Sequence, residues 1–153
     1  MAETRYKAVV VFDTMWQSTA KMARAVGEGL MQGGATPVEI MPLSSKHRSD
    51  VATAILDAGA LLVGSPTMNN QLFPSVADIL TYLAGLRPRH LVGAAFGSYG
   101  WADTAVKRLK EAMAEMKFEP VGDGISVQYR PTEEDLERAR AFGNELGAAA
   151  TAS

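Results

Sequence analysis

Three polar segments, each directly after an apolar run, contain the residue types best suited to bind a ligand. The first, residues 13–19, places hydroxyl groups at the start of a predicted helix, where free backbone N–H groups and the helix dipole favour a phosphate. It also contains Trp16, an aromatic residue that a simple helix cap does not need. The alternative is that Ser18 and Thr19 only cap the helix. The candidate ligand-binding residues of this segment are Thr14, Met15, Trp16, Gln17, Ser18 and Thr19.

The second segment, residues 64–71, is rich in amide and hydroxyl side chains, which both donate and accept hydrogen bonds. Such groups match the mixed donor and acceptor edge of a flavin pyrimidine ring, although an Asn-Asn pair is also ordinary turn chemistry. The candidate residues of this segment are Pro66, Thr67, Met68, Asn69 and Asn70.

The third segment, residues 97–101, places two large aromatic residues beside two glycines. Glycine lets the backbone approach a ligand closely, and the face of a Tyr or Trp side chain stacks on a planar ring. The alternative is that Trp101 only covers the helix that follows. The candidate residues here are Ser98, Tyr99, Gly100 and Trp101. A phosphate site beside a site for a flat ring system predicts flavin mononucleotide (FMN) as the ligand.

The composition is that of an ordinary globular domain and argues against several classes of function. The chain has 153 residues, 47% hydrophobic and 21% charged, with a net charge of −2, which predicts one domain and no nucleic-acid partner. With no cysteine and two histidines, we expect no metal site. No secretory signal or apolar run of roughly 18 residues is visible, so we expect no membrane partner and a cytoplasmic location. The phosphate-binding P-loop, G-x-G-x-x-G and G-x-S-x-G motifs are absent.

Apolar runs alternate with helical patterns five times along the chain. We predict strands over residues 8–12, 36–41, 60–63, 91–96 and 125–129. We predict helices from Ser18 to the Gly33-Gly34 pair, over 50–57 with Ser49 as N-cap, from Pro74, over 102–116, and from Thr132 with Asp135 in a capping box, with 148–153 frayed. This alternation predicts an α/β fold with a doubly wound, five-stranded parallel sheet in the flavodoxin-like order 2-1-3-4-5. The three polar segments then lie at the carboxyl edge of the sheet, where ligands bind.

Three stretches of the sequence carry a specific family pattern. They are residues 63–67 with Asn69, Asn70 and Pro74, residues 95–101, which read Ala-Phe-Gly-Ser-Tyr-Gly-Trp, and residues 131–136, which read Pro-Thr-Glu-Glu-Asp-Leu. On these stretches the chain resembles, over about residues 7–147, the flavodoxin-like domain of the A-type flavoproteins, also called flavodiiron proteins. Residues 13–19 resemble the phosphate loop of that family and depart from the general flavodoxin pattern T-x-T-G-x-T at Trp16 and Gln17.

The resemblance implies an FMN-binding electron-transfer domain. In the flavodiiron family this domain follows a metallo-β-lactamase-like domain with a diiron centre. It takes electrons from a rubredoxin-like or flavin reductase donor and passes them to the irons, which reduce dioxygen or nitric oxide. The present sequence has no H-x-E-x-D-H iron-binding segment. We therefore expect one FMN domain over residues 1–153, with no catalytic residue and no metal ligand, whose partner is the diiron domain of the same or a partner chain.

Two other functions fit the same residues. One is a flavin-dependent NAD(P)H:quinone reductase, which would need a binding site for the hydride donor, and no segment of the sequence indicates such a site. The other is an interaction module that has kept the fold without a flavin, although the retained hydroxyl and aromatic residues argue against it. A visible spectrum of the purified protein separates this module from the two flavoproteins.

Overall fold

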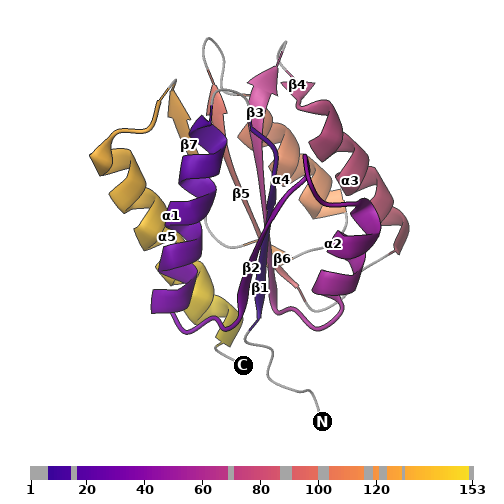
Figure 1. Ribbon diagram of the computed structural model, residues 1–153, viewed down its shortest axis with the longest axis horizontal. Helices are drawn as coiled ribbons and strands as arrows, with labels where there is room; N and C mark the ends of the chain where they lie inside the picture. The colour runs from indigo at the N-terminus through magenta and orange to yellow at the C-terminus, as the bar shows by residue number, and fades with distance from the viewer. Residues whose placement is uncertain are drawn as a thin grey trace.

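A parallel β-sheet forms the centre of the structure, with helices on both of its faces (Figure 1). The computed structural model describes residues 7–14, 17–68, 71–86, 91–99, 104–115, 119–120, 124–128 and 130–151. Strand β1 (Ala8–Phe12) lies inside the sheet, and all five of its residues are buried. A strand covered on both faces needs no polar alternation, which explains its continuous apolar sequence.

The main strands follow one another across the sheet in the predicted order. β2 (Val38–Pro42) pairs with β1, β1 pairs with β3 (Ala60–Met68), and β3 pairs with β5 (Val92–Tyr99), all in parallel. Two short strands share the far edge of β5. β6 (Glu119–Pro120) pairs with the first residues of β5, and β7 (Ile125–Gln128) pairs with the last. Because β7 is the predicted fifth strand, the order 2-1-3-4-5 is confirmed.

Two helices cover one face of the sheet and three cover the other (Figure 1). The first pair is α1 (Ser18–Gln32) and α5 (Glu133–Thr151), and the second group is α2 (Arg48–Ile55), α3 (Pro74–Leu86) and α4 (Ala105–Glu115). Glycines let α1 and α5 pack closely, since a Cβ added at Gly143 would lie 2.2 Å from the carbonyl oxygen of Val26. None of the helices in the described part of the chain is long and apolar enough to cross a membrane.

Parts of two predicted loops are strands in the structure. β3 continues to Met68, beyond its predicted end at residue 63, and β5 continues to Tyr99, beyond residue 96. The two extensions pair with each other, with Pro66 opposite Ser98. β3 also forms an antiparallel pair with β4 (Gln71–Leu72). Backbone pairing between neighbouring strands therefore keeps these polar residues extended, and hydropathy alone does not report it.

The predicted ends of one strand and one helix were also wrong. β2 begins at Val38, not at Thr36, because its pairing with β1 starts opposite Ala8. α5 remains helical to Thr151, whereas fraying was predicted from residue 148. Ala150 is buried in the same hydrophobic core as the residues of α1, and this burial holds the last turn in place.

Helix α2 begins and ends two residues earlier than predicted. The helix begins at Arg48 with His47 as its N-cap, and Ser49 is not the cap. The Ser49 N–H donates to Nδ1 of His47 at 3.1 Å, and the His47 N–H donates to Oδ2 of Asp50 at 3.0 Å. The histidine ring thus performs the role that the serine hydroxyl was expected to perform.

Lys7 forms an ion-pair cluster at the end of the sheet where β1 begins. Its Nζ lies 2.9 Å from Oδ1 of Asp57 and 3.3 Å from Oε1 of Glu39, and 12% of its side chain is exposed. Burial of the ammonium group acts to lower the pKa of Lys7, but the hydrogen bonds to the two carboxylates outweigh burial and raise this pKa. The cluster ties β1 to β2 and to the segment after α2.

Candidate functional site

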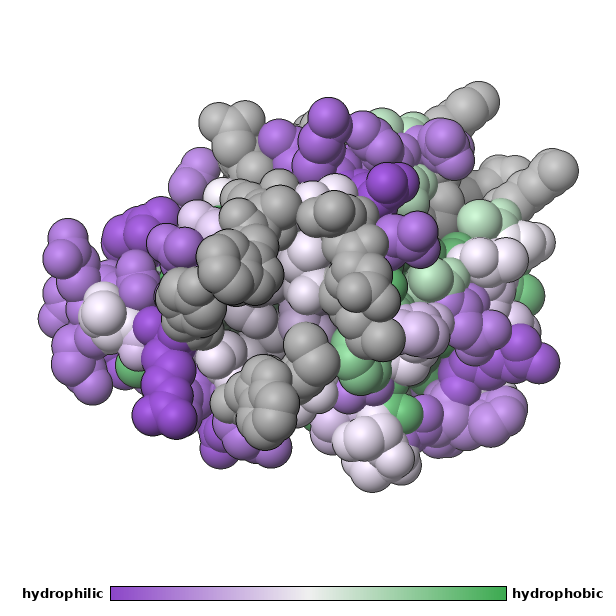
Figure 2. Space-filling view, turned by 90° about the horizontal axis from the view of Figure 1, so that it is seen from above, coloured by the Kyte–Doolittle hydropathy of each residue, from purple (hydrophilic) through white to green (hydrophobic). Residues whose placement is uncertain are grey.

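The ends of β1, β3 and β5 bring the three predicted ligand-binding segments to one edge of the sheet. Gly64 of β3 pairs with Phe12, the last residue of β1, and with Phe96 of β5. The three strands are therefore adjacent where β1 ends. Figure 2 looks onto the molecule from this side, and hydrophilic residues gather around the rim of the view. This edge is where a doubly wound α/β fold binds its ligands.

The structure describes some of the candidate residues and not others. Those outside the described residues are Met15, Trp16, Asn69, Asn70, Gly100 and Trp101, and only the backbone of Met68 is described. Ser18, Thr19, Pro66 and Ser98 are buried, Thr14, Thr67 and Tyr99 are half-buried, and Gln17 is exposed. The role of each candidate residue in binding therefore stays a prediction.

Helix α1 starts without the side-chain cap that the alternative interpretation of this segment requires. Its N-cap is Gln17, in the left-handed conformation with φ 67° and ψ 0°, and no side chain of the residues that the structure describes caps the helix. Ser18 and Thr19 lie inside the helix as its first residues, so the alternative that they only cap it is wrong. Gln17 stands where the general flavodoxin pattern has glycine, the residue that adopts a positive φ most easily. Gln17 adopts this left-handed conformation although it is not a glycine.

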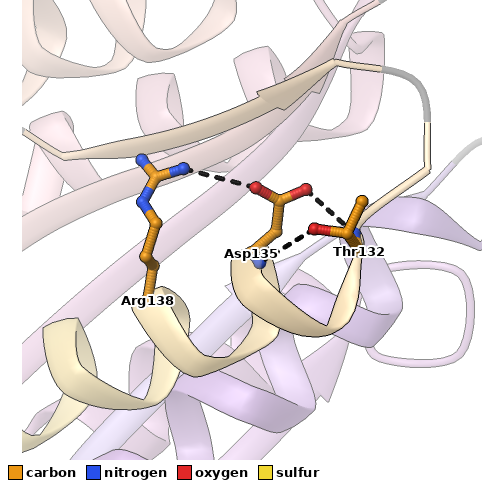
Figure 3. Close-up of polar contacts among 3 residues, drawn as sticks. All are labelled: Thr132, Asp135 and Arg138. Atoms are coloured by element: carbon orange, nitrogen blue, oxygen red, sulfur yellow. Dashed lines mark hydrogen bonds and ion pairs between the residues drawn. The ribbon is translucent and has the colours of Figure 1, made fainter.

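The start of α5 shows the type of cap that α1 lacks. The Thr132 N–H donates to Oδ2 of Asp135 at 2.9 Å, and the Asp135 N–H donates to Oγ1 of Thr132 at 3.1 Å (Figure 3). This is the predicted capping box, with aspartate in place of glutamate. Arg138 contacts the other carboxylate oxygen at 3.3 Å. Two backbone N–H groups at the start of α5 therefore donate to side chains of the protein itself.

The start of α1 is suited to an anion from outside the helix. Its first turn contains no acidic residue. Its first α-helical hydrogen bond runs from the Lys21 N–H to the Gln17 carbonyl oxygen at 3.1 Å, so the N–H groups before Lys21 have no acceptor within the helix. Unpaired N–H groups and the positive end of the helix dipole together stabilise a phosphate.

Thr14 provides the observation that points most directly to a ligand. Its Oγ1 atom is buried and has no hydrogen-bond partner in the described part of the chain. A buried hydroxyl without a partner costs about 1–3 kcal/mol, so a bound group that accepts from it would remove that cost. Asp13 beside it is already engaged, because it accepts the Thr14 N–H at 2.8 Å and the Ser75 hydroxyl at 2.6 Å. These residues fit a phosphate at the start of α1.

Three side-chain hydrogen bonds link the three segments in a closed ring. In each bond, a residue at the end of one strand contacts the first turn of a helix that follows a different segment. The bonds join Asp13 to the Ser75 hydroxyl (2.6 Å), Thr67 Oγ1 to the Ala105 N–H (3.1 Å), and Ser98 Oγ to Thr19 Oγ1 (3.0 Å). The described parts of the segments are therefore held relative to one another by the protein itself.

The sequence did not reveal two serines that help to build this edge. Ser65 is fully buried, donates to the Pro66 carbonyl oxygen at 2.8 Å and accepts the Phe73 N–H at 3.0 Å. Ser75, which follows the predicted helix-starting Pro74, binds Asp13 across the sheet edge. Their positions next to a glycine or a proline are typical of many turns, so no local signal distinguishes them.

The described parts of the second and third segments carry no charge. Residues 64–68 and 97–99 contain no Asp, Glu, Lys or Arg. Across the described ranges, no three His, Asp or Glu side chains lie close enough together to hold a metal ion. The chemistry on offer at this edge is therefore hydrogen bonding from hydroxyl and backbone groups, beside neutral and apolar surfaces.

Comparisons with known proteins agree with this arrangement. Residues 10–143 match the flavodoxin family. The chain is 48% identical over 143 residues to a nitric oxide reductase of Moorella thermoacetica. The aligned region covers 93% of this chain and 36% of that relative. It superimposes on rubredoxin oxygen:oxidoreductase from Desulfovibrio gigas (TM-score 0.93, 39% identity, 96% of this chain and 36% of the other) and on the flavodiiron protein from Giardia intestinalis (TM-score 0.92, 34% identity, 95% and 36%). The chain thus spans about a third of the length of these relatives.

Proposed function

This chain belongs to the flavodoxin family, its relatives include flavodiiron proteins, and its cofactor is FMN; we propose that it serves as an electron-transfer domain. The observation that carries the proposal is the buried Thr14 hydroxyl, which has no partner among the described residues and lies beside a helix start that none of their side chains caps. When bound, FMN supplies the one- and two-electron redox chemistry that no side chain provides. The protein supplies binding, orientation and a local electrostatic environment.

We assign the FMN phosphate to the first segment and the ring to the other two. Thr14, Ser18, Thr19 and the N–H groups at the start of α1 would hold the phosphate with neutral donors. Pro66, Thr67 and the two asparagines would face one side or edge of the ring. Tyr99, Gly100 and Trp101 would supply its flat surroundings, and the absence of charge in residues 64–68 and 97–99 supports this assignment.

The partner of this domain in our proposal is a diiron centre, on the same chain or on a second one. The relatives are about three times as long as this chain, which leaves room in them for a further domain. Their names, a nitric oxide reductase and a rubredoxin oxygen:oxidoreductase, support nitric oxide or dioxygen as the terminal acceptor and a rubredoxin-like donor, and a flavin reductase is the alternative donor in our proposal. This chain would pass electrons from the donor to the diiron centre and would not reduce nitric oxide or dioxygen by itself.

A flavin titration tests the assignment of the cofactor and its phosphate. We expect the purified protein to carry a flavin spectrum, or to bind FMN at one per chain after the flavin is removed. Riboflavin lacks the phosphate and should bind at least about tenfold more weakly, the loss expected for a hydrogen bond to a charged group. Equal affinity for the two flavins would contradict the phosphate role of the first segment. A protein that binds neither would be the interaction module.

Stopped-flow mixing separates the relay from a reductase. The relay should show slow reduction of its flavin by NADH or NADPH and no sustained quinone turnover. Rapid reduction by NADH followed by steady reduction of a quinone would instead identify a quinone reductase. Sustained nitric oxide consumption by the metal-free chain would contradict the assignment as a relay.

A further inference from the structure

Two hydroxyl groups from distant parts of the chain form a buried pair at the edge of the sheet. Oγ1 of Thr19 lies 3.0 Å from Oγ of Ser98, although 79 residues separate them in the sequence. Thr19 has no exposed surface, and Ser98 is 6% exposed. Thr19 lies in the first turn of α1, within the segment assigned to the phosphate, whereas Ser98 lies in the segment assigned to the ring.

The position of Ser98 is fixed by the sheet. Its residue pairs with Pro66 of β3 on one side and with Val127 of β7 on the other, so its backbone is held between two strands. Thr19 is held by the helix. The relative position of the two oxygen atoms therefore depends on the packing of α1 against β5 and does not depend on a mobile surface side chain.

The direction of this hydrogen bond decides what Thr19 can do. Each hydroxyl has one hydrogen to donate, and either of the two can donate in this pair. If Thr19 donates to Ser98, its hydrogen is used. If Ser98 donates to Thr19, the Thr19 hydrogen is available to an acceptor at the start of α1. A fully ionised phosphate has no hydrogen to donate and can only accept hydrogen bonds. It therefore selects the second direction, in which Ser98 donates to Thr19.

We propose that Ser98 is a positioning residue for the phosphate group of FMN and acts by donating its hydrogen bond to Thr19, and that it makes no essential contact with the flavin ring. The proposal rests on the proposed function, since it takes FMN as the ligand and the first segment as its phosphate site. A chain of two hydroxyl groups that ends on an anion is stronger than its separate bonds, because each bond polarises the next.

The other two hydrogen bonds that link the three segments cannot act in this way. Thr67 receives a hydrogen from the Ala105 backbone, and Asp13 receives one from Ser75, so the donor is fixed in both. Only the pair of Thr19 and Ser98 joins two rotatable hydroxyl groups among the three bonds. The bond from the Ala105 N–H to Thr67 therefore provides a control. Its loss disturbs the position of a segment and leaves the hydrogen bond between Ser98 and Thr19 unchanged.

The test compares the affinities of Ser98→Ala for FMN and for riboflavin, measured by fluorescence titration of the flavin-free protein. We expect FMN to bind about two- to fivefold more weakly than to the unsubstituted chain, because Ser98 strengthens the Thr19–phosphate bond without touching the phosphate, and riboflavin to bind with unchanged affinity. In a Thr19→Val background, Ser98→Ala should cause no further loss. The control Thr67→Val should weaken FMN and riboflavin by similar factors, since it disturbs the position of a whole segment.

Three results would overturn the inference. Equal weakening of FMN and riboflavin by Ser98→Ala would assign Ser98 to the ring or to the general structure. Full weakening by Ser98→Ala in the Thr19→Val background would show that it acts independently of Thr19. Failure of the unsubstituted chain to bind FMN would defeat the proposed function as well, which distinguishes the two failures. Should Ser98→Ala not fold, Ser98→Cys, with its weakly donating thiol, allows the same comparison.

Discussion

Replacing Thr14 with valine should change the stability of the chain and its affinity for FMN in opposite directions. Valine has nearly the same shape as threonine but no hydroxyl. Oγ1 of Thr14 is buried without a partner in the described part of the chain, a cost of about 1–3 kcal/mol. Without flavin, we therefore expect Thr14→Val to raise the free energy of unfolding by about 1–2 kcal/mol, which for a chain of this size is about 2–4 °C in Tm per kcal/mol.

In the presence of FMN the same substitution should be harmful. A hydrogen bond to a charged group contributes about 1.5–3 kcal/mol, so Thr14→Val should weaken FMN binding by roughly 10- to 150-fold. Riboflavin, which has no phosphate, should bind as before. Urea unfolding of the flavin-free protein gives the stability, and fluorescence titration gives the two affinities.

Thr67→Val is the matched control for this prediction. It removes the same hydroxyl, but Oγ1 of Thr67 accepts the Ala105 N–H at 3.1 Å. Its loss leaves that N–H without an acceptor, so the flavin-free chain should be destabilised by about 1–2 kcal/mol. If Thr14→Val also destabilises the flavin-free chain, or lowers the affinities for FMN and riboflavin equally, the interpretation of Thr14 as a phosphate donor is refuted.

Three further predictions follow from the packing, the backbone and the charges. Gly143→Ala should destabilise the chain by about 1–3 kcal/mol in urea unfolding, because the new Cβ would lie 2.2 Å from the Val26 carbonyl oxygen; Gly85→Ala, with nothing within 4 Å, should instead stabilise it by up to about 1 kcal/mol. Gln17→Gly should stabilise the chain by about 0.5–1 kcal/mol in the same assay, since it relieves a left-handed residue with φ 67°, and a loss of stability would contradict this strain. The pKa of Lys7 is raised in the folded state, so its stabilising effect should be complete below pH 10.5, the ordinary value, and be lost as the pH rises through the higher folded value. The difference in unfolding free energy between the unsubstituted chain and Lys7→Met, measured from pH 7 to about pH 11.5, should therefore shrink only at the alkaline end; a difference that is already lost near neutral pH would refute the ion-pair account.

Much of the fold follows from short-range patterns in the sequence. The apolar run of β1, the proline in the first turn of α3 and the capping box at Thr132 and Asp135 all act within a few residues, so the chain near each one is enough to predict the element. The strand order follows from the repeated βα connection and its right-handed crossover. These are the elements for which prediction and structure agree.

The predictions failed where a distant part of the chain decides the local structure. The polar ends of β3 and β5 looked like loops, but they pair with each other, and hydropathy does not register backbone pairing between strands. Residue type alone allowed Ser18 and Thr19 to be helix caps, yet the left-handed Gln17 is the N-cap and both residues lie inside α1. Residue 148 was predicted to begin a frayed tail, and burial of Ala150 against α1 keeps it helical.

The sequence by itself determined the type of site: three segments with hydroxyl, amide, glycine and aromatic residues, each after a strand of one parallel sheet. Only the tertiary structure decided which of these groups meet. Asp13 and Ser75 are 62 residues apart, Thr67 and Ala105 are 38 apart, and Thr19 and Ser98 are 79 apart, and each pair is joined by one hydrogen bond. A hydrogen bond requires two atoms to lie within about 3 Å with suitable angles. That precision comes from strand register and helix packing over the whole domain, and the spacing of residues along one chain does not contain it.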